Sequence, residues 1–241
     1  WMLGIVSVLC LVTLTGCTVV SYRKNTEFEG YFDSPKTVAL VEPDINMYKL
    51  TAGGVDEFNA QWTAASKVLV SQRIKQELEN YRSIKTAYME ANNLAEDDQD
   101  ILDQQAGMFF VVSNSIITHT YLPESSFPHK IKHFDYTMGK EVSALQKFGS
   151  ADTYLFCSGR NYIWTAGRAT LATFGLLVGA ATGVTIIIPA GPEWIVAALV
   201  DAHTGNVIWF NYIPMPGDMR EEKVVDRVIR SLFKSFPEKW R

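Results

Sequence analysis

Two histidines in the middle of the chain have the spacing of a metal site. His129 and His133 stand four residues apart in His-Lys-Ile-Lys-His, so on a helix both imidazoles would lie on one face. The glutamate that a helical metalloprotease motif places between two such histidines is absent, and two lysines stand there instead. Pro128 and the loop-like residues around it argue against a helix. We therefore expect a solvated loop without a metal, and keep a hydrolase that uses this region as a minority alternative.

A second group, Asp201, His203 and Thr204, has the residue types of a catalytic set. These residues belong to Asp-Ala-His-Thr-Gly, a turn sequence between two apolar runs, which predicts a hairpin. In such a turn Asp201 and Thr204 satisfy backbone groups, Gly205 adopts a positive φ, and Trp209 packs from the following strand. The sequence has no Gly-x-Ser-x-Gly elbow, phosphate loop or dinucleotide fingerprint. We expect no catalytic residue, no cofactor and no small-molecule substrate.

The strongest chemical signal is a cysteine that ends an apolar run. Residues 2–16 carry no charge and are rich in Leu, Val and Ile, and polar, charged sequence begins soon after Cys17. The run is short for a transmembrane helix and has the character of a secretory signal. Its last residues, Leu14-Thr15-Gly16-Cys17, resemble the bacterial lipobox, in which the cysteine sulfur receives a diacylglycerol. The sequence therefore predicts a signal peptide over residues 1–16 and an acylated Cys17 as the first mature residue.

The predicted anchor has consequences for location. Several acyl chains, each CH₂ group contributing ~0.8 kcal/mol when buried, hold a protein on a membrane effectively permanently. Position 18 is Thr and not Asp, which by resemblance to enterobacterial lipoproteins implies the outer membrane, with the domain facing the periplasm. The alternative is an ordinary signal peptide or anchor helix, because the positive segment expected before the apolar run is missing. Since the chain opens with Trp1, we expect the start codon to lie upstream.

Composition excludes several other classes. The chain has 241 residues, of which 47% are hydrophobic and 20% charged, which is typical of a folded globule. Its net charge of -4 leaves no basic excess for nucleic acid. Once Cys10 is removed with the signal and Cys17 is acylated, Cys157 is the remaining thiol, so the mature chain has no intrachain disulfide.

The pattern of apolar residues predicts one domain of the α/β class, over residues 36–241, after a lipidated tether over residues 17–35. We expect a mixed sheet flanked by helices, with a glycine-rich apolar insertion before the last hairpin. The expected strands are 37–41, 108–121, 151–164, 193–200 and 206–213. The expected helices are a long one capped by Asp56 with apolar rows from Phe58 and Val70, a short one over 142–148, and a final one with a capping box at Asp218 and Glu221. The acidic residues 96–103 lack the features of a calcium loop and predict a solvated helix start or loop.

The order of these elements, with its motifs, resembles a known family. Ala151-Asp152-Thr153-Tyr154-Leu155-Phe156, a glycine-containing insertion, and then Leu199-Val200-Asp201-Ala202-His203-Thr204-Gly205-Asn206-Val207-Ile208-Trp209 is similar to the pattern of bacterial envelope lipoproteins of the TolB N-terminal-like superfamily. That superfamily includes the curli secretion channel CsgG, the penicillin-binding-protein activator LpoB and lipoproteins of neisserial type. The resemblance implies a non-enzymatic domain that assembles with itself or with an envelope machine. The sequence lacks the two long amphipathic hairpins of the curli channel, so a nonameric barrel is not implied.

The insertion is the most informative internal segment. Residues 171–188 are apolar, small or Thr throughout, and Gly175, Gly179 and Gly183 recur every four residues. On a helix this spacing lines one face with glycine and lets a second helix approach closely, as in membrane helix pairs. Glycine also weakens a soluble helix by about 1 kcal/mol per residue, so a buried structural element is the other interpretation. Membrane contact, oligomerisation and burial all remain open at this point.

These observations favour a lipid-anchored envelope protein with a structural or assembly role, in which Gly175, Gly179 and Gly183 serve self-association or envelope contact. An oligomeric accessory of secretion or of a surface structure fits that description. The alternative is a monomeric tethered regulator that binds a periplasmic partner such as a cell-wall enzyme. Stable oligomerisation would distinguish the two.

Overall fold

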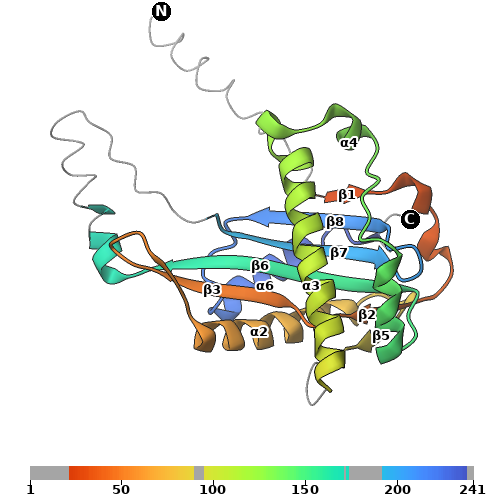
Figure 1. Ribbon diagram of the computed structural model, residues 1–241, viewed down its shortest axis with the longest axis horizontal. Coiled ribbons are helices and arrows are strands. Elements are labelled where there is room, and N and C mark those ends of the chain that lie inside the picture. The colour runs from red at the N-terminus through yellow and green to blue at the C-terminus, as the bar shows by residue number, and fades with distance from the viewer. Residues whose placement is uncertain (1–21, 90–94, 171, 174–191, 238–241) are drawn as a thin grey trace, which may run out of the picture.

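The structure of the protein, a computed structural model, describes residues 22–89, 95–170, 172–173 and 192–237 (Figure 1). In this part of the chain eight strands form one mixed sheet with the order β1-β8-β7-β6-β2-β5, and β3 and β4 extend it beside β6. The strands are β1 (Tyr22–Lys24), β2 (Lys36–Leu40), β3 (Asp44–Leu50), β4 (Asp56–Phe58), β5 (Ile84–Tyr88), β6 (Thr153–Trp164), β7 (Trp194–Asp201) and β8 (Val207–Pro214). The longer helices are α2 (Ala60–Leu78), α3 (Glu96–Ile116) and α6 (Glu222–Leu232). A short helix, α4 (Pro128–Lys132), follows α3 in the chain. The predicted α/β class is confirmed.

Parallel and antiparallel pairing divide the sheet into two halves. β2 is parallel to both of its neighbours, β5 and β6, and β3 continues in the same direction along β6. β6, β7 and β8 form an antiparallel meander, and β1 pairs antiparallel with β8. The hairpin predicted around residues 201–205 is thus confirmed as β7 and β8. β5 and β1 are the two edges of the path.

Both faces of the sheet are buried because helices cover each one. Along β7, Ile195, Ala197 and Leu199 belong to the core under α2 and α6, whereas alternate residues belong to the core under α3. This alternation follows from the two-residue period of a strand. Figure 1 shows α3 crossing the front of the sheet with α6 behind it. A strand buried on both faces needs two helical layers, and the chain supplies them.

The long helix α2 begins later than predicted. Its N-cap is Asn59, whose side chain accepts a hydrogen bond of 2.9 Å from the Trp62 N–H. Asp56, the predicted cap, lies instead in β4 and pairs with Leu50, so that prediction is wrong. Of the two predicted apolar rows, the one that starts at Val70 is fully buried, whereas Phe58 lies in β4 and is 55% exposed.

The strand predicted over residues 108–121 is wrong, because these residues complete α3 and the π-helical turn η3 (Ile117–Tyr121). The run is rich in β-branched and aromatic residues, which favour strands by propensity. Packing overrides that preference: Leu102, Phe109 and Ile116, each seven residues apart, bury one helical stripe against the sheet. The acidic start of α3 agrees with the predicted solvated helix start.

Two further predictions are corrected at the ends of elements, and one is confirmed. Residues 22–35, placed in the tether, include β1 and contribute Phe32 to the core, so the folded part begins before residue 36. The capping box does not form, because α6 begins at Glu222 and the Asp218 carboxylate binds Arg220 instead. The short helix near residue 145 is confirmed as a 3₁₀ helix, η5 (Lys140–Phe148).

Candidate functional site

The residues predicted to anchor and to assemble the protein lie outside the described part of the chain. They are Cys17, Gly175, Gly179 and Gly183. The structure does describe the two ends that flank them. β1 begins at Tyr22, five positions after Cys17, and β6 ends at Trp164, ahead of the glycine-spaced segment.

The turn between β7 and β8 is organised by one carboxylate. Asp201 Oδ1 accepts hydrogen bonds from the His203 N–H at 3.1 Å, the Thr204 N–H at 2.8 Å and the Thr204 hydroxyl at 2.8 Å. Gly205 has a φ of 75°, the left-handed conformation in which glycine is favoured. Trp209 is fully buried and packs edge-on against Phe236, with ring centroids 5.3 Å apart. These polar side chains hold the turn together, which leaves Asp201 no lone-pair direction on Oδ1 for chemistry.

The other carboxylate oxygen of Asp201 joins the turn to the N-terminal segment. The Tyr31 hydroxyl donates to the Asp152 carbonyl at 3.1 Å and lies 3.3 Å from Asp201 Oδ2. Burial, together with the negative charges of Asp201 and Asp152, raises the pKa of Tyr31 well above its usual value. The Asp152 carboxylate in turn accepts a 2.7 Å hydrogen bond from the Thr37 N–H at the start of β2. A raised pKa keeps this tyrosine protonated, as a donor, which suits a structural link between three segments.

The paired histidines lie at the two ends of a short helix. The prediction that Pro128 prevents a helix here is wrong. Pro128 occupies the first turn of α4, where no amide donor is needed. The rings of His129 and His133 are 4.9 Å apart between centroids, and both residues are exposed. Within the described ranges no three His, Cys, Asp or Glu side chains come together as ligands of a metal ion.

Cys157 lies inside β6 and is 3% exposed. Burial raises the pKa of its thiol far above the ordinary value, and the charge of Asp44 adds to that effect. The thiol is therefore a small apolar core group.

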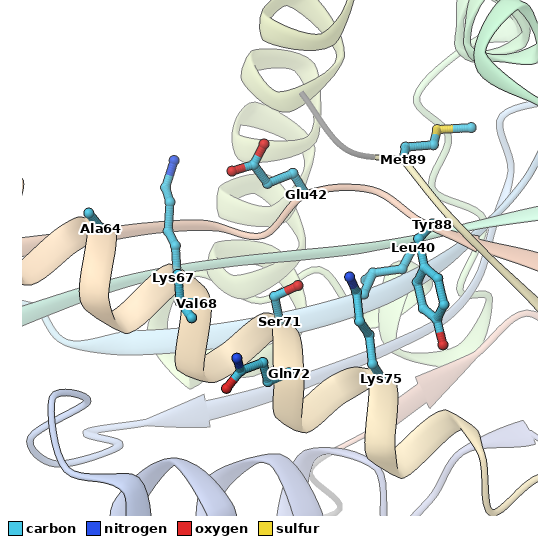
Figure 2. A pocket seen from close by; sticks show the side chains of 10 residues that line it. All are labelled: Leu40, Glu42, Ala64, Lys67, Val68, Ser71, Gln72, Lys75, Tyr88 and Met89. Carbon is cyan, nitrogen blue, oxygen red and sulfur yellow. The ribbon is translucent and has the colours of Figure 1, made fainter. Parts of the chain in front are cut away.

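A cleft with a volume of about 420 Å³ lies between α2 and the carboxyl ends of β2 and β5. Figure 2 shows Lys67, Ser71 and Lys75 rising from α2 into this cleft, with Tyr88 beside Lys75. In open α/β sheets ligands commonly bind outside the carboxyl ends of parallel strands, which is where this cleft lies. The residues lining it are Leu40, Glu42, Ala64, Lys67, Val68, Ser71, Gln72, Lys75, Tyr88 and Met89.

The two lysines of the cleft, Lys67 and Lys75, both interact with neighbouring side chains. The Lys67 ammonium lies 4.0 Å from an Asp44 carboxylate oxygen, and the Lys75 ammonium lies 4.6 Å from the centre of the Tyr88 ring. Tyr88 is 40% exposed and ends β5, the sheet edge. The cleft therefore combines amines and an exposed aromatic ring beside β5, which is an edge strand among the residues that the structure describes. The sequence does not reveal this cleft, because β5 is a short, half-exposed strand without a clear apolar alternation.

In the described ranges, no helix combines the length and the apolar character needed to cross a bilayer.

Comparison with known proteins finds similarity at the level of solved structures. No family model matches the sequence, and no curated protein matches it. Among solved structures, the lipoprotein GNA1162 from Neisseria meningitidis is similar with a TM-score of 0.31 and 10% identity. The match covers 84% of this chain and 99% of that one. At this level of similarity, function has to be argued from the residues of the chain itself.

Proposed function

We propose that this protein is a lipoprotein of the bacterial envelope, held in the outer membrane by acylated Cys17 with its α/β domain in the periplasm. One observation carries the proposal, namely Leu14-Thr15-Gly16-Cys17 at the end of an uncharged apolar run. Thr18 in place of Asp favours the outer membrane. The role is one of assembly or binding, and not of catalysis.

The geometry of the domain fits this proposal. Because Tyr22 is already paired in the sheet, five residue steps separate the folded domain from Cys17, a reach of at most ~17 Å. The domain would therefore rest close to the membrane and would not hang on a long linker. The carboxylate that most resembles a catalytic group, Asp201, is committed to hydrogen bonds within its turn, which supports a non-enzymatic role.

The anchor is tested by two matched substitutions. Cys17→Ser should abolish incorporation of an alkyne-labelled fatty acid and release the chain from washed membranes. Cys10→Ser, in the same apolar run but outside the predicted lipobox, should leave both properties unchanged. Membrane retention of an unacylated Cys17→Ser chain would contradict the proposal and would point to residues 171–188 as the anchor.

Self-association is the second part of the proposal. Gly175, Gly179 and Gly183 are the residues that would bring two copies close together, so Gly179→Leu should reduce the mass of the full-length acylated protein in mild detergent. Light scattering measures that mass. A discrete oligomer that Gly179→Leu dissociates supports an assembly role.

A monomer in both forms favours the alternative of a tethered regulator, and one structural observation supports that alternative. The cleft lies beside β5, an edge strand of the described sheet, where an extended segment of a periplasmic partner would add a strand.

A further inference from the structure

Three apolar side chains project into solvent at one end of α3. Leu122, Phe127 and Ile131 are 45%, 52% and 44% exposed. Phe127 and Ile131 lie one helical turn apart, because the Ile131 N–H donates to the Phe127 carbonyl at 3.1 Å. We call these three residues, with Lys130 and Lys132, the α4 patch.

The α4 patch is held firmly by the structure beneath it. The Phe127 N–H donates to the His119 carbonyl at 2.9 Å, which folds the segment back on the end of α3. The His119 ring stacks on the Phe127 ring, with 4.1 Å between centroids and 8° between planes. Phe134 and Tyr136, next along the chain, are buried in the core. Phe127 is therefore presented outward on an ordered support, which distinguishes it from an isolated exposed residue.

The patch lies beside the point where the chain leaves the domain toward Cys17. The Arg23 guanidinium of β1 lies 5.3 Å from the centre of the Tyr121 ring, one residue before Leu122. Figure 1 shows β1 and α4 at the same side of the molecule, with α2 and β5 at the opposite side. An anchor at most ~17 Å from Tyr22 therefore places this side, and not the α2 side, against the lipid.

The charged residues also differ between the α4 side of the domain and the opposite end of α3. Between Glu124 and Asp135 no residue is acidic, and Lys130 and Lys132 both lie in this interval. Lys130 pairs with Asp135 at 2.6 Å, whereas Lys132 is exposed and forms no ion pair with any residue that the structure describes. The acidic first turn of α3 lies at the far end of that helix (Figure 1). The end nearest the anchor is therefore apolar and presents Lys132 to solvent, which suits an anionic membrane surface.

We propose that the α4 patch docks on the membrane in which Cys17 is anchored. Phe127, Ile131 and Leu122 enter the boundary between headgroups and acyl chains, and Lys130 and Lys132 lie among anionic headgroups. This inference rests on the proposed function, since it needs the lipid anchor. Docking would fix the orientation of the domain and turn the α2 cleft toward the periplasm.

The test uses the acylated full-length protein in vesicles of phosphatidylethanolamine and phosphatidylglycerol. A new cysteine at Ile131→Cys is labelled with the environment-sensitive dye NBD, and Val68→Cys, an exposed apolar position on α2, is the matched control. Cys17 is blocked by acylation and Cys157 is buried, so the dye attaches to the new thiol. Brominated lipids should quench the Ile131 dye by about twofold or more, because an interfacial residue lies within 5–10 Å of the acyl boundary. The Val68 dye should stay unquenched.

Several outcomes overturn the inference. Equal quenching at both positions, or none at Ile131, excludes docking through the α4 patch. A blue shift at Ile131 that needs crowded protein and is insensitive to bromine identifies a second copy as the occupant. Quenching at Ile131 that is unchanged when phosphatidylglycerol is omitted overturns the placement of the lysines among anionic headgroups. Failure of the proposed function is distinguishable, because a chain without acyl groups on Cys17 would not associate with the vesicles through the anchor at all.

Discussion

Replacing Gly205 with alanine should destabilise the protein strongly, whereas the same change at Gly107 should stabilise it. At Gly205 the backbone has a φ of 75°, and an added Cβ would overlap the Gly139 carbonyl oxygen and lie 2.6 Å from its carbonyl carbon. Gly139 belongs to the segment that pairs with the turn, since the Met138 N–H donates to the Gly205 carbonyl at 2.9 Å. At Gly107 an added Cβ meets no atom within 4 Å.

The loss of stability expected for Gly205→Ala follows from these contacts. The left-handed conformation costs an alanine about 1–2 kcal/mol. Moving the Gly139 backbone away weakens the Met138 hydrogen bond and its neighbour from the Val207 N–H to the Tyr136 carbonyl, each contributing about 1 kcal/mol. The sum is about 3–4 kcal/mol, or a fall in melting temperature of about 10 °C for a domain of this size. Gly107→Ala in an exposed helix should raise the free energy of unfolding by about 1 kcal/mol.

Urea unfolding followed by circular dichroism, on the full chain in mild detergent, measures both variants. The reasoning is refuted if Gly205→Ala and Gly107→Ala unfold at the same urea concentration, because the two differ only in backbone conformation and in what the new methyl group meets.

Two further predictions concern titratable groups. Cys157 should resist a maleimide reagent in the native mature protein and react on denaturation, because burial raises the pKa of its thiol; rapid native labelling, measured by mass, would contradict this. Asp218 accepts two hydrogen bonds from Arg220, at 2.8 and 2.6 Å, which lower the pKa of its carboxyl. A lowered folded-state pKa adds stability above the unfolded value of about 3.9, and that stability is lost as the pH falls through the folded-state pKa. Asp218→Asn should therefore cost under about 1 kcal/mol at pH 7 and flatten the acid limb of stability against pH, and the difference from the native chain should disappear as the pH falls through the folded-state pKa; an unchanged acid limb would count against the pairing.

The sequence predicted the elements whose apolar pattern is continuous. β6 and the β7–β8 hairpin are buried on both faces over most of their length, and their runs of aromatic and β-branched residues are recognisable without any tertiary information. The inner stripe of α6, with Val225, Val228, Ile229 and Leu232, is likewise visible as a 3.6-residue period.

The sequence failed where tertiary packing decides the structure. The run from Met108 to Tyr121 has strand-forming residue types, but the face of the sheet opposite α2 and α6 needs a cover, and α3 supplies it. The seven-residue spacing of Leu102, Phe109 and Ile116 is the signal that could have identified a helix. Strands β1 and β5 are short and half-exposed, so pairing with distant partners, and not their own pattern, defines them.

The candidate sites also differ in whether the sequence alone reveals them. The proposed lipobox is a local pattern, Leu14-Thr15-Gly16-Cys17, and can be read directly from the chain. The α4 patch depends on Arg23 meeting Tyr121 across almost one hundred residues, and no local pattern shows that contact. The cleft likewise depends on β5, which the sequence did not reveal.

Mass spectrometry of the N-terminal peptide of the protein purified from membranes tests the central claim most directly. The expected peptide begins at Cys17 and carries a diacylglyceryl group on its sulfur. A peptide that reads through Gly16 and Cys17 with a free thiol would contradict it.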